Sequence, residues 1–530
     1  IGSGMLHPGL SPDMKETSSS PPRWLVPAAV VACLVYLGAE LFLVGGLGFP
    51  LDDSWIHLQF ARNLAAGWGL SYNPGELVTG STAPLWTALL SLLIPLPGNV
   101  LAWTKLLGIA FHAAGVSAAW RLARELGLGR GLAGMAAFLI LTTSWLVWSA
   151  LSGMEVPLFV FLSLWGLLLH IRERRRPEAP PLSIAVLAVA SLARPEGLLL
   201  LVLALLDRLL VFDREEEDGA LIWRRPPLRP LLVGLLFAAL ALIGPLLAYR
   251  WAGGSFLPTT FGAKGAGLRE MLPNLAYVHT VIGVFFRSQP FLALLAGAGV
   301  VALIARLGTR DDRRKDCGLL PALWVLGLPL AYSLLAPGPT KLMGNFGRYY
   351  FPLLPVVVIL GTLGLEPAAR ALRRRPLGAL LAGLILATAL WGFTQGAMRY
   401  ARNVANVEDS DVKIARWLAG RVPPDAVLAV NDIGAIKFLL PNPVLDLAAI
   451  ANPEIRQEVS RIMAETGMPW AEAMAEAIVR RRPDYVVVFP KWLPALDSDP
   501  RFQAIHRLEI PDNITMGDDE IVVYAMAWTR

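Results

Sequence analysis

Residues 24–55 read WLVPAAVVACLVYLGAELFLVGGLGFPLDDSW, a hydrophobic segment followed at once by two adjacent carboxylates, Asp52 and Asp53. The apolar part, 24–48, is longer than the ~20 residues that a helix needs to cross the hydrocarbon core of a bilayer. A carboxylate costs several kcal/mol inside hydrocarbon, so acidic residues are rare there and are usually functional. A pair of them directly after a span therefore indicates a functional site at the membrane surface.

The whole chain has the composition of a polytopic membrane protein. Of its 530 residues, 55% are hydrophobic and 17% are charged, and the apolar residues form long blocks. These blocks predict a mainly α-helical transmembrane bundle over residues 24–396, with about eleven spans. The candidate spans are 24–46, 101–121, 132–150, 156–171, 182–193, 197–212, 230–250, 291–306, 318–335, 351–366 and 377–396. A further apolar stretch, 84–96, would rise only ~20 Å as a helix, so it predicts a juxtamembrane or re-entrant helix.

Arginine and lysine predict the orientation of the bundle. If residues 1–23 form a disordered cytoplasmic lead-in and 84–96 does not cross, the strongly basic loops all face the cytoplasm. These loops lie near 121–130, 172–176, 224–229, 310–315 and 370–375. The first loop, 49–100, and the chain after residue 396 then face the outside of a bacterial-type inner membrane. The net charge of +6 belongs to the cytoplasmic loops, which excludes nucleic acid as a partner.

The composition changes after residue 396, where charged residues return and the apolar runs shrink to strand length. The segments 427–431, 485–489 and 521–526 predict strands, and 410–421 and 470–481 predict helices. Residues 397–530 are therefore expected to form an external α/β domain. In this domain, the turn at 431–434 could cradle an anion, although a purely structural turn is the favoured interpretation.

The first loop, 49–100, is far longer than a connection between two helices requires. Trp55, Ile56, Phe60 and Leu64 share one helical face, which predicts a helix lying in the membrane interface. The polar residues of the loop are candidates for lining a substrate cavity, and they are His57, Tyr72, Asn73 and Glu76.

Three charged residues at the ends of later spans are further candidates for this cavity. They are Glu155, Arg194 and Glu196. The alternative for Arg194 and Glu196 is a structural ion pair at the helix break around Pro195. Asp52 and Asp53 also have a plainer alternative, because Asp is a preferred residue at helix N-termini.

Several motifs together resemble a known family. They are the Asp-Asp pair after the first span, ARNL at 61–64, SYNPGE at 71–76, STAPLW at 81–86, GGSFLPTTFGAK at 253–264 and MGNFGRYY at 343–350. The pattern resembles the GT-C glycosyltransferases that use polyprenyl-phosphate sugars, nearest to the bacterial arabinofuranosyltransferase-like and mannosyltransferase-like members. The resemblance covers most of residues 24–396. It implies an inverting transferase, pentosyl- or hexosyl-, that moves a sugar from a polyprenyl-phosphate donor to a hydroxyl of a glycan or lipid acceptor outside the membrane.

The resemblance also implies roles for individual residues. Asp52 is expected to act as general base, and Asp53 to orient the acceptor. Asp52 and Asp53 are also the candidate ligands if a divalent cation, Mg²⁺, Mn²⁺ or Ca²⁺, takes part. The donor phosphate needs cationic partners, for which Lys264, Arg348 and Arg62 are the candidates, although such residues can also simply neutralise lipid headgroups.

Two other functions remain open from the sequence. A transporter or flippase of lipid-linked sugars would usually have paired halves with matching broken helices, and no such symmetry is evident. A ligase that transfers a whole glycan from a lipid pyrophosphate would share the outer-face chemistry. It would be expected to carry its decisive basic residues in a large later loop.

Overall fold

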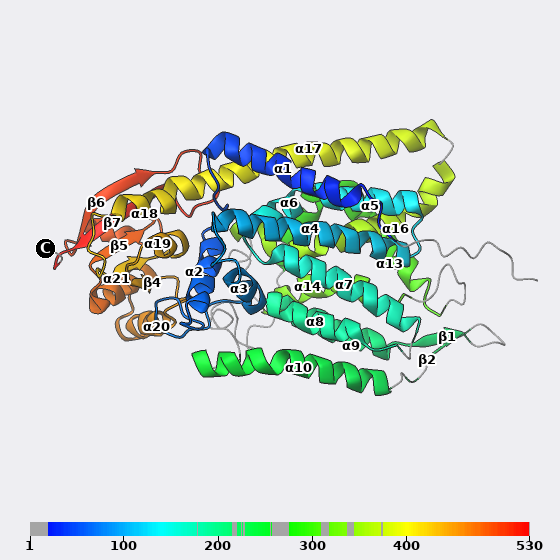
Figure 1. Ribbon diagram of the computed structural model, residues 1–530, viewed down its shortest axis with the longest axis horizontal. Coiled ribbons are helices and arrows are strands. Elements are labelled where there is room, and N and C mark those ends of the chain that lie inside the picture. Colours follow the sequence, from blue (N-terminus) through cyan, green and yellow to red (C-terminus); the bar gives the residue numbers. More distant parts are fainter. Residues whose placement is uncertain are drawn as a thin grey trace, which may run out of the picture.

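The computed structural model describes residues 20–176, 179–214, 220–223, 225, 228–254, 256, 275–308, 317–335, 344–372 and 375–528. Figure 1 shows a long helical bundle with a compact mixed domain at one end, and α2 and α3 lie where the two parts meet. Lys264, one of the residues expected to bind the donor phosphate, lies outside the described residues.

Every expected span coincides with helical structure. The helices of the bundle and its first loop are α1 (Leu25–Val44), α2 (Asp53–Ala65), α3 (Pro84–Ser91), α4 (Val100–Glu125), α5 (Arg130–Thr142), α6 (Ser144–Leu151), α7 (Val156–Arg174), α8 (Leu182–Ala193), α9 (Glu196–Leu209), α10 (Leu228–Gly253), α12 (Leu275–Ser288), α13 (Pro290–Ile304), α14 (Leu320–Leu335), the 3-10 helix η2 (Gly344–Leu353), α16 (Leu354–Leu372) and α17 (Pro376–Val407). A small antiparallel pair, β1 (Phe212–Arg214) and β2 (Leu221–Trp223), follows α9. The sequence did not predict α12, and the expected span 132–150 is bent by 52° between α5 and α6.

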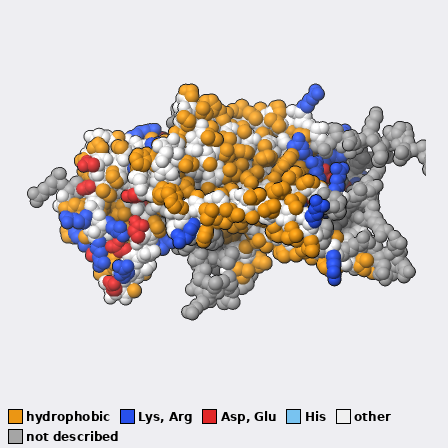
Figure 2. Space-filling model, turned by 60° about the horizontal axis from the view of Figure 1, so that its bottom comes forward, with side chains coloured by type: hydrophobic (Ala, Val, Ile, Leu, Met, Phe, Trp, Pro, Cys, Tyr) orange, Lys and Arg blue, Asp and Glu red, His pale blue; other side chains and the backbone are white. Residues whose placement is uncertain are grey.

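By length and apolar composition, six of the described helices can cross a membrane, or up to eight if each of two bent helix pairs is one span. The second bent pair, α12 and α13, turns by 116°. Figure 2 shows a broad hydrophobic band on this bundle, with acidic and basic side chains on the C-terminal domain and basic side chains at the opposite end. These features indicate a multi-pass membrane protein. The short helix expected at 84–96, within the first loop, is present as the eight-residue α3, while its juxtamembrane or re-entrant position stays a prediction.

Some helices pack with almost no space between their backbones. A Cβ atom added at Gly361 of α16 would lie 2.2 Å from the carbonyl oxygen of Leu292 in α13, and one at Gly364 would lie 2.2 Å from that of Leu295. In the other direction, a Cβ at Gly299 of α13 would lie 2.0 Å from the carbonyl oxygen of Leu360. Small residues permit such close helix packing inside membranes, where dispersion contacts replace the hydrophobic effect.

The C-terminal domain begins without a break in the chain, because α17 runs through the boundary expected at residue 397 (Figure 1). A short π-helix, η3 (Glu408–Val412), and α18 (Lys413–Leu418) lead into a sheet with strand order β4-β3-β5-β7-β6. Its elements are β3 (Leu428–Val430), α19 (Gly434–Leu439), β4 (Val444–Asp446), α20 (Glu454–Thr466), α21 (Trp470–Arg481), β5 (Tyr485–Val488), the 3-10 helix η4 (Pro494–Ser498), β6 (Phe502–Glu509) and β7 (Glu520–Met526). The strand β3 is parallel to β4 and β5, while β7 is antiparallel to β5 and β6.

Replacing Gly361 with alanine is expected to destabilise the bundle by about 1–3 kcal/mol, the usual cost of overpacking, because the new methyl group meets the backbone of α13. Thermal unfolding of the detergent-solubilised protein measures this. The matched control is Gly383→Ala in α17, where the structure places no described atom within 4 Å of the new Cβ. Equal melting temperatures for the two variants would contradict the tight α13–α16 contact.

Candidate active site

The helix α2 lies between the bundle and the C-terminal domain (Figure 1). Of the four residues expected to face the membrane interface, Trp55, Ile56 and Phe60 are buried and Leu64 is partly exposed. Trp55 packs against Phe49 before α2 and against Phe438 of α19. The interfacial-helix prediction is therefore wrong for α2, because both of its apolar sides are covered by protein.

On the bundle side of α2, Asp53 forms an ion pair with Arg348 of η2. The Arg348 side chain is buried, whereas the Asp53 side chain is 36% exposed. The guanidinium of Arg348 bonds Asp53 through Nη2, while its buried Nη1 has no hydrogen-bond partner within the described part of the chain. Arg348 can therefore donate a further hydrogen bond to an anion.

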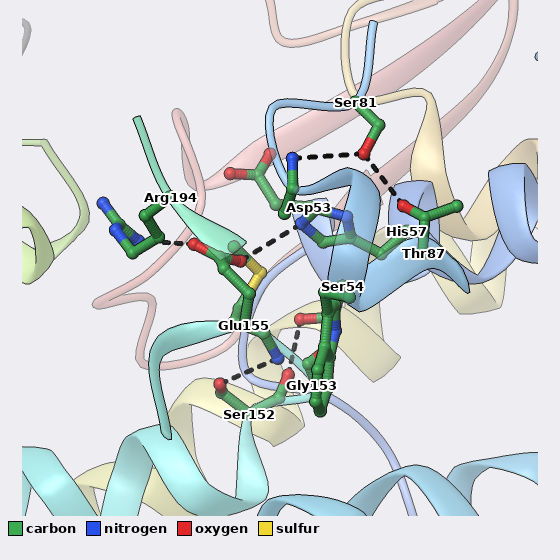
Figure 3. A network of polar contacts seen from close by, with 12 residues as sticks. Asp53, Ser54, His57, Ser81, Thr87, Ser152, Gly153, Glu155 and Arg194 are labelled. Carbon is green, nitrogen blue, oxygen red and sulfur yellow. Dashed lines mark hydrogen bonds and ion pairs between the residues drawn. The ribbon is translucent and has the colours of Figure 1, made fainter. Parts of the chain in front are cut away.

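One helical turn after Asp53, His57 joins a second polar network (Figure 3). Its Nε2 lies 3.3 Å from Oε2 of Glu155, which precedes α7. Glu155 also pairs with Arg194, whose Nη2 lies 2.7 Å from Oε1 of Glu196. Burial alone would raise the pKa of Glu155. The charge of Arg194 and the contacts of His57 outweigh this effect and hold the pKa below its ordinary value. The neighbouring charge of Arg194 thus favours the carboxylate form of Glu155.

Aromatic side chains connect these two networks. The ring of Tyr349 lies 5.5 Å from the guanidinium of Arg194 and 5.6 Å from that of Arg348. The hydroxyl of Tyr332 donates to Glu196 at 2.6 Å. Of the residues expected in the substrate cavity, the structure thus brings His57, Glu155, Arg194 and Glu196 together beside Asp53 and Arg348.

Asp52 turns the other way, toward the C-terminal domain. Its Oδ2 accepts a hydrogen bond from the backbone amide of Gly434 at 2.6 Å, and its Oδ1 accepts one from Ala435 at 2.7 Å. Burial raises the pKa of Asp52 to about 7, against the lowering effect of these two bonds. The residue expected to act as general base is therefore buried, with both oxygens bound to the domain.

Three other candidates also contact the C-terminal domain. Arg62 donates to the carbonyl of Phe438, the hydroxyl of Tyr72 donates to the carbonyl of Ile433, and the amide of Asn73 donates to the carbonyl of Val444. Glu76 is exposed and accepts a hydrogen bond from Asn73. The guanidinium of Arg62 is thus engaged by backbone carbonyls of α19, and Tyr72 and Asn73 lie in the same domain contact.

The two carboxylates expected to share a divalent cation have different partners. Asp52 binds backbone amides of α19, and Asp53 binds Arg348. Among the residues that the structure describes, no group of three or more His, Cys, Asp or Glu side chains is arranged to hold a metal ion. This geometry does not fit a cation held jointly by Asp52 and Asp53.

A buried polar cluster, which was not predicted from the sequence, fixes the start of the first loop. Lys105 of α4 donates to Glu40 of α1 at 2.9 Å and to the hydroxyl of Tyr400 in α17 at 2.6 Å. Glu40 in turn accepts a bond from the backbone amide of Gly48 at 2.8 Å. A lysine inside an apolar span was the available signal, because such a charge requires a partner.

The architecture matches a solved membrane protein over nearly its full length. ArnT from Cupriavidus metallidurans bound to undecaprenyl phosphate superposes with a TM-score of 0.60 at 15% identity, covering 95% of this chain and 98% of that one. This chain has the GT-C fold. The fold predicted from the sequence, a polytopic helical bundle with a C-terminal α/β domain, is confirmed.

Other GT-C structures match less completely. The Archaeoglobus fulgidus oligosaccharyltransferase in complex with Zn and sulfate gives a TM-score of 0.51 at 14% identity, covering 87% of this chain and 67% of that one. AglB from the same organism, in complex with an inhibitory peptide and a dolichol-phosphate, gives 0.50 at 13% identity, covering 88% and 69%. A family model described as a domain of unknown function (DUF8728) matches residues 397–524, and no curated protein matches the sequence.

The stability of the protein is expected to fall as the pH rises from about 4 to about 7. Burial raises the pKa of Asp52 to about 7 and that of Asp446 to about 6, so the folded protein binds protons that the unfolded chain has already released in this range. Melting temperatures between pH 4 and pH 8 measure this. Asp52→Asn should flatten part of the dependence, and the exposed control Asp425→Asn should leave it unchanged. A profile identical in Asp52→Asn and wild type would show that Asp52 does not contribute.

Proposed function

We propose that the protein is an inverting glycosyltransferase that moves a sugar from a polyprenyl-phosphate donor to a hydroxyl of a cell-envelope glycan or lipid. The observation that carries the proposal is the joined network of Asp53, Arg348, Glu155 and Arg194 at the C-terminal-domain end of a GT-C bundle. The ArnT structure, which shares this fold over nearly its whole length, holds undecaprenyl phosphate.

The reaction needs a base and a place for the leaving phosphate. The acceptor hydroxyl loses its proton as its oxygen attacks the anomeric carbon, while the bond from that carbon to the phosphate oxygen breaks. The proposal assigns the proton to Asp53 rather than to Asp52. Asp53 is partly exposed, while both oxygens of Asp52 already accept backbone hydrogen bonds.

Arg348 is the cation proposed for the donor phosphate. Its Nη1 can donate to a phosphate oxygen while Nη2 holds Asp53 in place. A phosphate that shares Arg348 weakens the hold of this guanidinium on Asp53, which makes the carboxylate a stronger base once the donor is bound. Lys264 remains the predicted second phosphate ligand.

The distribution of basic side chains supports an orientation of the protein in the membrane. Figure 2 shows basic side chains at the end of the bundle away from the C-terminal domain, and the domain itself carries both acidic and basic ones. Basic residues next to spans favour the cytoplasmic side of a membrane. The site and the C-terminal domain are then external, at the face of an inner membrane where polyprenyl-linked sugars are used. A transporter or flippase does not require a carboxylate beside an anion-binding arginine at one end of the bundle.

Replacing Asp53 with asparagine is expected to lower kcat at least ~100-fold, the usual effect of losing a general base. Arg348→Lys should lower kcat/KM ~10-fold or more, because lysine keeps the charge but not the two-pronged guanidinium. Transfer from radiolabelled polyprenyl-phosphate sugars to membrane acceptors, catalysed by purified protein, measures both.

Asp425→Asn, on the surface of the C-terminal domain, is the control for purification and folding. Wild-type rates in Asp53→Asn would remove this residue from the mechanism. Movement of intact lipid-linked sugar across liposomes, without any transfer, would support the transporter alternative instead.

A further inference from the structure

The helices α2 and α19 lie side by side, and α2 contacts both ends of α19. At the first end, the carboxylate of Asp52 accepts the amides of Gly434 and Ala435 at 2.6 and 2.7 Å. At the other end, Arg62 donates to the carbonyls of Phe438 and Lys437 at 2.8 and 3.3 Å, and its guanidinium lies 4.6 Å from the Phe438 ring. These are backbone groups that α19 cannot satisfy by itself, since the end residues of a helix lack intrahelical partners.

The contact at Asp52 depends on the absence of a side chain at Gly434. A Cβ atom there would lie 2.2 Å from the backbone oxygen of Asp52 and 2.6 Å from its Oδ1. The backbone itself would block any larger residue, so relaxation of a flexible side chain cannot relieve this clash. Glycine is therefore required for the two helices to approach this closely.

The first loop continues this contact along the edge of the sheet. The hydroxyl of Tyr72 donates to the carbonyl of Ile433 at 2.7 Å. The side chain of Asn73 both donates to and accepts from the backbone of Val444, at 3.0 and 3.2 Å. The C-terminal domain thus holds α2 and the loop after it through backbone groups at several points.

The residues proposed to take part in the reaction lie on the other side of the same helix. With 3.6 residues per turn, Asp53 and His57 share a face, while Asp52 and Arg62 point away from it. On the bundle side, Asp53 pairs with Arg348. His57 lies beside Glu155 on the same side (Figure 3). Any rotation or shift of α2 at its contact with α19 therefore moves Asp53 relative to Arg348.

From this arrangement we infer that the C-terminal domain positions the base: Asp52 and Gly434 fix α2, and through it Asp53, for sugar transfer. The inference rests on the proposed function. It makes Asp52 a positioning residue, and it gives the C-terminal domain a part in the reaction that is independent of any binding of acceptor.

Two variants of the full-length protein test the inference, Asp52→Asn and Gly434→Ala. Hydrogen exchange of the peptide that contains the amides of residues 434 and 435 should speed up in both. Asparagine has one acceptor oxygen in place of the two that bind these amides, and a Cβ atom at residue 434 displaces the carboxylate. Exchange in α2 should rise as well. The control Gly392→Ala, in α17, introduces a methyl group with no described atom within 4 Å and should leave exchange and turnover unchanged.

Kinetics separate positioning from proton transfer. Both variants should lower kcat about 10- to 100-fold, the scale of a misplacement of ~1 Å, with a smaller change in the KM for donor. They should keep the pH dependence of kcat, because Asp53 still accepts the proton. Asp53→Asn, in contrast, should lose the limb of the profile that reports the base.

Three results would overturn the inference. The first is faster exchange at residues 434–435 with unchanged kcat, which would make the contact purely structural. The second is loss of the pH dependence in Asp52→Asn but not in Asp53→Asn, which would make Asp52 the base. The third is unchanged exchange in both variants. Wild-type protein without transferase activity would contradict the proposed function instead, and exchange in α2 would then still show whether the domain holds this helix.

Discussion

The two adjacent carboxylates at the start of α2, Asp52 buried and Asp53 partly exposed, need different partners, because the geometry of a helix points them in different directions. Successive residues are rotated by ~100°, so adjacent side chains cannot share one partner. Asp52 is satisfied by backbone amides of the C-terminal domain and Asp53 by Arg348 of the bundle. Because an unpaired buried charge is costly, α2 is held in place only when both parts of the protein surround it.

At the break between α8 and α9, buried charges are likewise paired with groups from other parts of the protein. Arg194 and Glu196 flank Pro195, which interrupts the helix, and both charged side chains are buried. Arg194 is matched by Glu155 from the start of α7 as well as by Glu196, so three helix ends meet at one ionic cluster. An interrupted helix is tolerated inside a membrane protein where other groups satisfy the freed backbone and charges.

The bundle could be predicted because long apolar blocks specify spans directly. The helix α12 was missed because it is short and amphipathic, and carries His279 and Arg287. The site residues on the bundle side were identified because charged groups beside spans are conspicuous. The contacts of Asp52, Arg62, Tyr72 and Asn73 could not be predicted from the sequence. Their partners are backbone atoms of α19, of β4 and of the residue just before α19. Every residue has such backbone groups, so the residue types do not indicate which of them form these bonds.

Charge balance limits how the proposed donor can be held. Within the described residues, the carboxylates of Asp53, Glu155 and Glu196 pair with the guanidinium groups of Arg194 and Arg348. A phosphate added to this set has to compete with carboxylates for each arginine. Arg194 bonds two carboxylates, whereas Arg348 bonds one and retains a donor, so Arg348 is the arginine that can engage the phosphate with the smaller loss. Because Arg348 also holds Asp53, we propose that a second cation, Lys264, shares the charge of the leaving phosphate.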